Sequence, residues 1–201
     1  MSNGDEKMTK VKNINTLSAT KYLSLYSADY INKKGDLRNW TIASRKSLET
    51  IENKFFHGGE DKIDAVVILA NHVDENKLVL IRQFRVPINN YVIELPAGLI
   101  DGNEEIEEAV KRELKEETGL DLIEIDREGT KEKVYISAGM TDESVAFVKC
   151  TCNGTVSKEN LEDDEDIEVV MVTKEEAKKL IDSNEVMDIK TLLAIQNFIL
   201  S

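Results

Sequence analysis

Residues 98–120 read GLIDGNEEIEEAVKRELKEETGL, and the interpretation of the whole chain starts from this stretch. Its middle has apolar residues at the spacing of an amphipathic helix, which would bury one stripe. These residues are Ile106, Ala109, Val110 and Leu114. Gly119 follows the last predicted turn, and glycine readily adopts the left-handed conformation that ends a helix. The stretch therefore predicts a loop, a helix and a second loop.

The acidic residues of this helix are placed against the ordinary rules of helix stability. Glu113 and Glu117 are four residues apart and share a face, with Glu116 beside them. Like charges at this spacing are destabilising, and acidic groups in a last turn oppose the helix dipole by roughly 0.3–1 kcal/mol each. A solvated acidic helix is one explanation. A functional site is the better one, because a hard divalent cation such as Mg²⁺ or Mn²⁺ prefers carboxylate oxygens and would offset these costs.

The order of residues in this stretch also resembles the Nudix box. All the defined positions of that motif are present, with both gaps of the correct length: Gly98, Glu104, Arg112, Glu113, Leu114, Glu116, Glu117, Gly119 and Leu120. The resemblance implies an α-β-α sandwich with a mixed sheet, in which the box forms a loop-helix-loop. It also implies that the glutamates hold a divalent metal.

Composition limits the other possibilities. A chain of 201 residues is long enough to bury the core of one ordinary domain and to carry an extra element. Its 39 acidic and 26 basic residues give a net charge of −13, which argues against nucleic-acid or membrane partners, since both need a basic surface. There is no apolar signal core at the N-terminus, and the two cysteines, Cys150 and Cys152, are expected to be reduced packing residues. We expect a cytoplasmic protein.

The N-terminal part is predicted to be a separate small element. Residues 1–13 are polar and expected to be frayed, whereas residues 22–26 and 40–44 have the composition of strands, separated by a turn around Gly35. Two or three strands do not hold together alone in water, so they must pack on the main body or on a partner chain. We therefore predict two domains: residues 1–59 as an N-terminal antiparallel β element for dimerisation, and residues 60–201 as the Nudix domain.

The main body alternates strand and helix patterns. Strands are expected near residues 65–70, 77–84, 91–95, 133–137, 144–151 and 167–172. Helices are expected in the box, at residues 174–182 after a capping box that begins at Thr173, and at residues 188–200. This order predicts an α/β (α+β) fold with a mixed sheet.

The resemblance extends beyond the box to one branch of the family. Residues 83–87 (QFRVP) and 94–98 (ELPAG) look like those of the ADP-ribose pyrophosphatases, as does Trp40 followed five residues later by Arg45. Trp40 is the only tryptophan and lies in a polar context, so it would serve either as a stacking platform for adenine, worth about 1–3 kcal/mol, or as packing for the N-terminal sheet. The guanidinium groups of Arg45 and Arg85 suit a diphosphate, although each could instead form a surface ion pair.

The resemblance also assigns roles around the box. The metal ligands would be Glu113, Glu117 and Glu116 with the backbone carbonyl of Ala97, and glycine at position 98 permits a close backbone approach there. In the family the arginine that matches Arg112 orients the glutamates by ion pairing, and Glu104 is expected to have a similar supporting role.

Two loops are candidates for activating water. The acidic run at residues 162–166 is similar to the family's loop that carries a catalytic glutamate; Glu165 is our first choice and Glu162 the second, while a solvated acidic loop is the alternative. Residues 137–143 (SAGMTDE) resemble the segment after the box and end at Glu143, a candidate for substrate binding. Ala138 stands where a proline is typical of the ADP-ribose pyrophosphatases, which weakens the substrate assignment without affecting the metal chemistry.

These features together predict a Mg²⁺-dependent enzyme that hydrolyses ADP-ribose to AMP and ribose 5-phosphate. The resemblance implies a homodimer, with residues 20–47 exchanged or packed across the two-fold so that Trp40 serves the partner's site. Ala138 favours the nearest alternative, a pyrophosphatase for a UDP- or GDP-sugar. A non-catalytic nucleotide sensor is a more distant alternative, since a binding module would not need all the glutamates.

Overall fold

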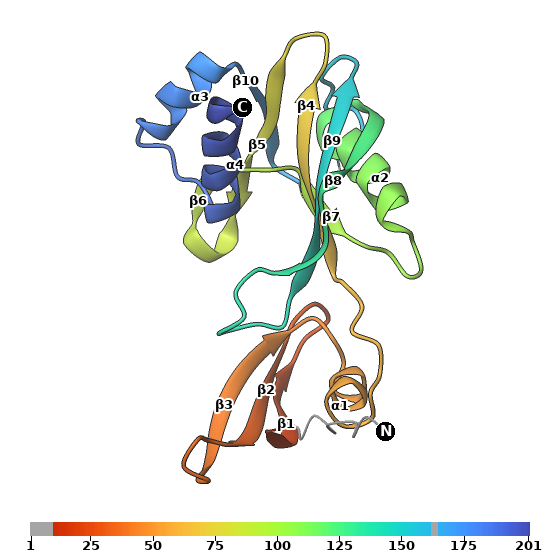
Figure 1. Cartoon of the computed structure of the whole chain (residues 1–201), viewed down its shortest axis with the longest axis vertical. Helices are drawn as coiled ribbons and strands as arrows, with labels where there is room; N and C mark the ends of the chain where they lie inside the picture. The colour runs from red at the N-terminus through yellow and green to blue at the C-terminus, as the bar shows by residue number, and fades with distance from the viewer. Residues whose placement is uncertain (1–9, 162–164) are drawn as a thin grey trace, which may run out of the picture. The chain divides into compact units, whose positions relative to one another are not determined.

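The computed structural model describes residues 10–161 and 165–201, which form two compact units (Figure 1). The first unit combines the chain up to Asp64 with a later segment, Tyr135–Ser144. The second unit contains Ala65–Val134 and Val145–Ser201. The segment 135–144 belongs to the first unit although it lies far along the chain, so a single boundary in the sequence does not reproduce this division. The predicted domains, residues 1–59 and 60–201, stay a prediction.

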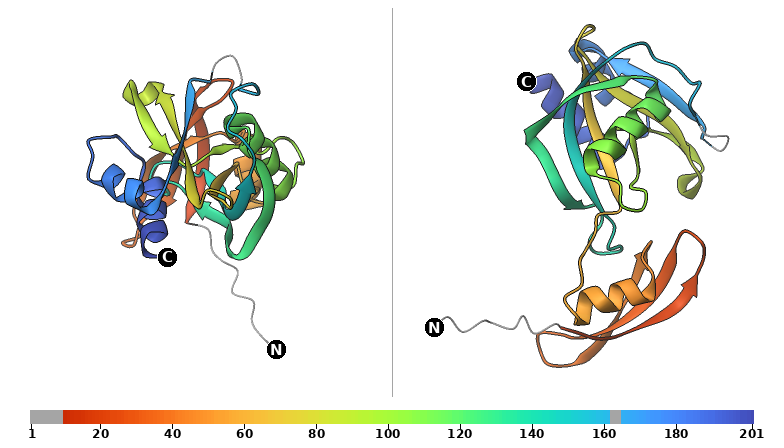
Figure 2. Two further views of the ribbon diagram at one scale, coloured as in Figure 1. Left: turned by 90° about the horizontal axis from the view of Figure 1, so that it is seen from above. Right: turned by 90° about the vertical axis from the view of Figure 1, so that its right-hand side faces the viewer.

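The first unit is a three-stranded antiparallel sheet with a helix on one face (Figure 2, right). Its elements are β1 (Val11–Ala19), β2 (Ser24–Ile31), β3 (Leu37–Ser44) and α1 (Leu48–Phe56). Side chains of the sheet and of α1 form its core, namely Ile14, Tyr26, Ala28 and Ile51. The helix begins where the Ser47 side chain accepts a hydrogen bond from the Thr50 backbone N–H. The antiparallel sheet agrees with the sequence-based expectation.

Two elements of this unit differ from what the sequence suggested. Residues 11–13 are not frayed but begin β1, a strand in which Ile14 is the one fully buried side chain, so the alternation typical of a half-buried strand is hidden. The helix α1 is absent from the sequence-based prediction, because Ile51 is its one fully buried residue and its end lies close to the predicted domain boundary after residue 59.

The second unit is built on a seven-stranded sheet. Its strands are β4 (Ala65–His72), β5 (Lys77–Arg85), β6 (Asn90–Glu94), β7 (Ala97–Leu99), β8 (Asp121–Tyr135), β9 (Ser144–Asn153) and β10 (Ile167–Val172). The main path runs β10-β5-β4-β9-β8, with β6 beside β5 and β7 beside β4. Strands β4 and β9 are parallel, whereas β4 pairs antiparallel with β5 and β7, which confirms the predicted mixed sheet.

Helices cover both faces of this sheet, as Figures 1 and 2 show. The helix α2 (Ile106–Thr118) lies on one face, and the pair α3 (Lys174–Ile181) and α4 (Ile189–Leu200) lies on the other. This cover explains why residues 65–70 of β4 are a continuous apolar run, since a strand with helices on both faces is buried on both. The Thr173 capping box is present and opens α3, as predicted.

The strand β8 is the main difference in this unit. The sequence indicated a strand only near residues 133–137, but β8 has 15 residues and begins directly after the box. Most of its side chains are exposed or partly exposed and many are charged, so it lacks the apolar pattern by which strands are recognised.

The remaining general expectations concern the cysteines and the membrane. Cys150 and Cys152 are free and buried, and burial raises their pKa values to about 12 and about 11. Both thiols are therefore protonated at neutral pH and act as packing groups. In the described part of the chain, no helix has the length and apolar character needed to cross a membrane.

Candidate active site

The box forms a loop-helix-loop around α2. The helix begins after Glu105, whose side chain accepts from the Glu108 N–H while the Glu108 side chain accepts from the Glu105 N–H. It ends at Gly119, which has φ = 76° and donates its N–H to the Lys115 carbonyl. The left-handed stop predicted at Gly119 is confirmed. Between these two caps, one face of α2 packs against β4 and β7.

Two carboxylates are buried on that face. Glu113 is 8% exposed and Glu117 is 2% exposed. The backbone N–H of Ala97 in β7 donates to Glu117 Oε2 at 2.9 Å. Arg112 Nη1 donates to Glu113 Oε1 at 2.7 Å. Burial of two acidic groups beside each other is costly unless a cation accompanies them, so this arrangement has the character of a functional site rather than of a solvated helix face.

Gly98 makes room for one of these carboxylates. A Cβ atom at position 98 would lie 1.9 Å from Cδ and Oε1 of Glu113, far inside van der Waals contact. The requirement is steric and not conformational: the position needs a residue without a side chain because the carboxyl group lies directly against the backbone of β7. The glycine that begins the motif and the glutamate in its middle are thus in contact.

Arg112 clamps the acidic groups of the box. Its Nε and Nη2 donate to Glu104 at 3.0 and 2.8 Å, a bidentate pair, while Nη1 donates to Glu113 and to Glu116 Oε2 at 2.7 and 3.0 Å. Nη2 also donates to the Leu99 carbonyl at 2.9 Å. The hydrogen bonds between Arg112 and Glu104 lower the pKa of the Glu104 carboxyl and raise the pKa of the Arg112 guanidinium. This geometry has the form of the orienting role expected for Arg112 and the supporting role expected for Glu104.

The electrostatics of the site link the box to two other segments. Burial raises the pKa of Glu117 well above its ordinary value, and the negative charges of Glu113 and Glu165 raise it further. Burial is also the largest cause of the raised pKa of Glu113, to which the Glu165 charge contributes. The positive charge of Arg85 acts on Glu117 in the opposite direction. Glu165 and Arg85 are therefore within electrostatic reach of the buried carboxylates.

Strand pairing explains why these two residues meet. Ile167 at the start of β10 pairs with Gln83 of β5, and the Phe84 N–H donates to the Asp166 carbonyl at 3.2 Å. Asp166 thus lies opposite Phe84, and the next pair in the same antiparallel register places Glu165 beside Arg85. Arg85 Nε in turn donates to Glu94 Oε2 at 2.6 Å, so Arg85 has a protein partner as well as a position near the box. Glu162 lies outside the described residues.

The other predicted substrate residues lie in the first unit. Trp40 is 53% exposed, and its indole N–H donates to the Gly139 carbonyl at 3.1 Å. It lines a cavity of about 320 Å³ whose walls include Phe55, Tyr135 and Ala138. An exposed ring beside a cavity is the arrangement that a stacking role requires. The sequence did not single out Phe55 or Tyr135, since each reads as an ordinary core or strand aromatic.

A buried ion cluster holds the loop that carries Glu143. Lys46 is largely buried, and its Nζ lies 2.6 Å from Asp64 Oδ1 and 3.9 Å from Asp142 Oδ2. Arg45 and Glu143, the neighbours of Lys46 and Asp142 in the chain, form an ion pair with Nε–Oε1 of 2.7 Å. The cluster thus brings together Arg45 and Glu143, which the sequence nominated separately.

The donors fit a hard divalent cation in chemistry, although the described residues contain no group of three or more acidic, histidine or cysteine side chains gathered to hold one. Arg112 donates hydrogen bonds to Glu113 and Glu116. The two buried carboxylates, Glu113 and Glu117, lie beside β7, where the glycine at position 98 allows the Glu113 carboxyl to approach the backbone closely. Oxygen-only donors of this kind suit Mg²⁺ or Mn²⁺.

Comparison with known proteins identifies the class. Residues 61–190, well over half of the chain, match the NUDIX domain family, and the chain belongs to this family. A solved structure titled "Crystal structure of ADP compounds hydrolase" has a TM-score of 0.67 at 20% identity, and the match covers 92% of this chain and 89% of that one. This likeness supports the fold, and the predicted Nudix fold class is confirmed.

Several of the similar proteins are named pyrophosphatases. The chain is 40% identical over 133 residues to the ADP-ribose pyrophosphatase of Bacillus subtilis (strain 168), which covers 66% of this chain and 70% of that protein. It is 31% identical over 174 residues to the ADP-ribose pyrophosphatase of Saccharomyces cerevisiae, covering 84% and 71%. It is also 31% identical over 160 residues to a GDP-mannose pyrophosphatase of Shigella flexneri, covering 76% and 81%.

Proposed function

We propose that this protein is a divalent-metal-dependent hydrolase that cleaves the pyrophosphate bond of ADP-ribose to give AMP and ribose 5-phosphate. The observation that carries the proposal is the burial of Glu113 and Glu117 against the backbone at Ala97 and Gly98, in a chain 40% identical to an ADP-ribose pyrophosphatase. A buried pair of carboxylates that is oriented by an arginine and faces a strand is suited to phosphate chemistry with a cation.

The metal site would consist of three glutamates and one backbone group. Mg²⁺ or Mn²⁺ would be held by Glu113, Glu117 and Glu116 with the Ala97 carbonyl. When bound, such cations neutralise charge on the diphosphate oxygens and acidify water. Arg112 keeps the glutamates oriented through its hydrogen bonds to Glu113 and Glu116.

The remaining residues act on water and on the substrate. Glu165, or Glu162 in the same acidic run, accepts a proton from the attacking water as its oxygen bonds to one phosphorus; the bridging P–O bond then breaks and its electron pair stays with the other phosphate. In the second unit, Arg85 binds the diphosphate. The first unit has its own candidates: Arg45, held by Glu143, for a phosphate group, and Trp40 for stacking on an adenine.

A second substrate class has specific support. A GDP-mannose pyrophosphatase is among the relatives, and Ala138, which departs from the residue typical of ADP-ribose enzymes, lines the cavity beside Trp40. A UDP- or GDP-sugar is therefore the alternative substrate. A nucleotide sensor without activity is the least favoured reading, because a module that only binds nucleotides would not need the complete set of box glutamates.

The test is turnover of ADP-ribose, UDP-glucose and GDP-mannose, followed by release of phosphate from the products with a coupling phosphatase, in Mg²⁺ and in EDTA. We expect turnover that EDTA abolishes, with the highest kcat/KM for ADP-ribose. If another nucleotide sugar is turned over fastest, the substrate assignment changes to that compound, and the proposed metal-dependent hydrolysis of the pyrophosphate bond stays. Tight binding without turnover of any compound would contradict an enzymatic function.

We also propose that the chain forms a homodimer through the N-terminal element, residues 1–59. Three large apolar side chains at the connected ends of β1 and β2 are exposed, Leu17, Leu23 and Leu25, and apolar groups gathered on a surface are typical of interfaces. Light scattering should then give twice the chain mass of 22.7 kDa. A mass of one chain at micromolar concentration would contradict the dimer.

The free, buried cysteines and the nucleotide substrate favour action in the cytoplasm.

A further inference from the structure

We propose that Tyr91 is a positioning residue for the hydrolysis, because it holds Asp166 and thereby sets the place of the neighbouring Glu165. The inference rests on the proposed function, in which Glu165 accepts the proton of water. It concerns a tyrosine that lies outside the box and that the sequence did not nominate.

The first observation is a direct hydrogen bond across two strands. The Tyr91 hydroxyl on β6 donates to the Asp166 side chain, and this contact raises the pKa of Tyr91. The Asp166 carbonyl separately accepts from the Phe84 N–H. Asp166 is therefore held twice, once by the backbone of β5 and once by the side chain from β6, immediately before β10 begins at Ile167.

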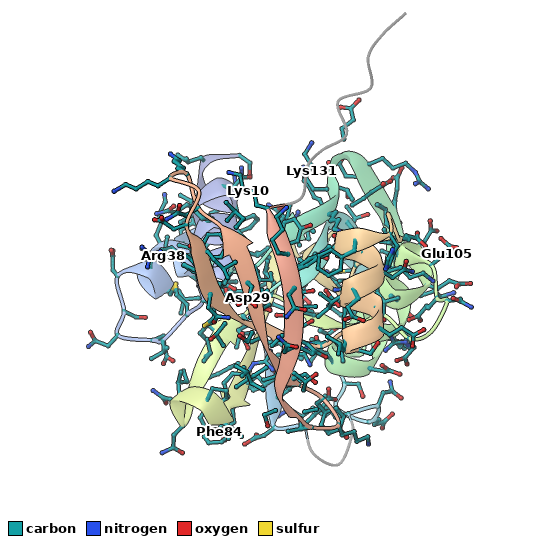
Figure 3. All side chains as sticks on the ribbon, turned by 90° about the horizontal axis from the view of Figure 1, so that it is seen from below. Lys10, Asp29, Arg38, Phe84, Glu105 and Lys131 are labelled. Carbon is teal, nitrogen blue, oxygen red and sulfur yellow. The ribbon has the colours of Figure 1, made fainter. Side chains whose placement is uncertain are left out.

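The second observation is that the tyrosine ring is itself held. Its partner across the β5–β6 ladder is Phe84, and the two rings meet edge to face with centroids 5.5 Å apart. The guanidinium carbon of Arg82 lies 4.2 Å from the Tyr91 ring centroid, a cation–π distance. Phe84 is labelled on this part of the sheet in Figure 3. With packing on both sides, the Tyr91 hydroxyl has a defined direction and Asp166 is its acceptor.

The third observation connects the contacts of Tyr91 with Arg82, Phe84 and Asp166 to the activation of water by Glu165. Glu165 is the residue next to Asp166, and the antiparallel register of β10 against β5, extended past the Phe84–Asp166 hydrogen bond, brings it beside Arg85, a residue proposed to bind the diphosphate. A peptide unit links Glu165 to an anchored neighbour, so the anchor limits the positions that its carboxylate can take. Loss of the anchor reduces the fraction of molecules in which Glu165 is in place, and the turnover number falls by that fraction.

The experiment measures kcat and KM for Tyr91→Phe and for Asp166→Ala with the preferred nucleotide sugar and Mg²⁺. One hydrogen bond of ordinary strength is removed, so kcat should fall roughly two- to tenfold. KM should stay within about twofold, because no group proposed to bind substrate is changed. Asp166→Asn keeps an oxygen that accepts from Tyr91 and should retain most of the wild-type kcat. Tyr22→Phe, which removes a hydroxyl from an exposed tyrosine of the first unit, is the matched control and should have no effect.

Two combinations separate positioning from simple structural damage. The double variant Tyr91→Phe/Asp166→Ala should be no slower than the slower single variant, because both remove the same contact. In a Glu165→Gln background, Tyr91→Phe should cause no further loss, since the group that it positions no longer accepts a proton. Thermal unfolding of Tyr91→Phe should stay within about 2–4 °C of the wild type.

The inference is overturned by an unchanged kcat in Tyr91→Phe, by a change in KM alone, or by a full additional loss in the Glu165→Gln background. Failure of the proposed function gives a different result, namely a wild-type protein without EDTA-sensitive turnover. The same assay therefore distinguishes the two failures.

Discussion

Replacing Glu117 by glutamine is expected to lower the rate of hydrolysis by at least about 10³-fold while leaving the fold intact. Removing one group that stabilises charge in a preorganised site typically costs 10²–10³-fold, and Glu117 would in addition be a ligand of the cation. The substitution is nearly isosteric. The glutamine oxygen can still accept the hydrogen bond from Ala97 N–H, which the wild-type carboxylate accepts at 2.9 Å.

The stability of this variant should change little. Glu117 is 2% exposed and burial disfavours its charged form, so loss of the charge removes a desolvation cost, whereas the new amide N–H₂ group needs a partner. We expect these two terms to leave the free energy of unfolding within about 1–2 kcal/mol of the wild-type value. Chemical denaturation of the metal-free protein measures this difference.

The matched control is Glu107→Gln on the same helix. Glu107 is exposed, and its Oε2 lies 3.5 Å from Nη2 of Arg127, which is also exposed, so the variant should lose neither activity nor stability. Near-normal turnover in Glu117→Gln, measured at saturating Mg²⁺, would show that this carboxylate is not part of the metal site. A similar loss in Glu107→Gln would show that the assay reports the general acidity of α2 instead.

The Gly98→Ala variant is expected to lose about 10²-fold or more in kcat/KM with only a modest loss of stability. Its Cβ would lie 1.9 Å from Cδ of Glu113, so the carboxyl group must move. A displacement of about 1 Å in a catalytic group can cost 10²-fold. The clash is with the end of a flexible side chain, and overpacking of this kind costs about 1–3 kcal/mol in unfolding free energy.

Gly59→Ala is the control for the clash itself. A Cβ at position 59 would lie 2.7 Å from Cγ of Asn53, again the end of a flexible polar side chain, but no proposed site residue is touched. This variant should keep wild-type turnover. If Gly98→Ala were as active as Gly59→Ala, the exact place of the Glu113 carboxylate would not matter for the reaction and its role as a metal ligand would be wrong.

The local elements that the sequence predicted correctly share one property, which is a complete short-range signal. The helix α2 has its apolar stripe and its glycine stop, α3 has the Thr173 capping box, and β4 has an unbroken apolar run. The elements that escaped prediction lack such signals. β1 and α1 each bury a single residue completely, and β8 is long but mostly exposed and charged.

By itself, the sequence determined the family, the helix that carries the acidic groups and the residue types that the chemistry needs, because these depend on identity and spacing within one helix and its caps. Only the tertiary structure decided which groups meet. The contact of Gly98 with Glu113 depends on β7 pairing with β4, and the approach of Glu165 to the box depends on the register of β10 against β5. The hydrogen bond between Tyr91 and Asp166 joins residues 75 positions apart. Such contacts arise from strand pairing and side-chain packing between residues far apart in the sequence. No local sequence pattern indicates which of these residues will meet.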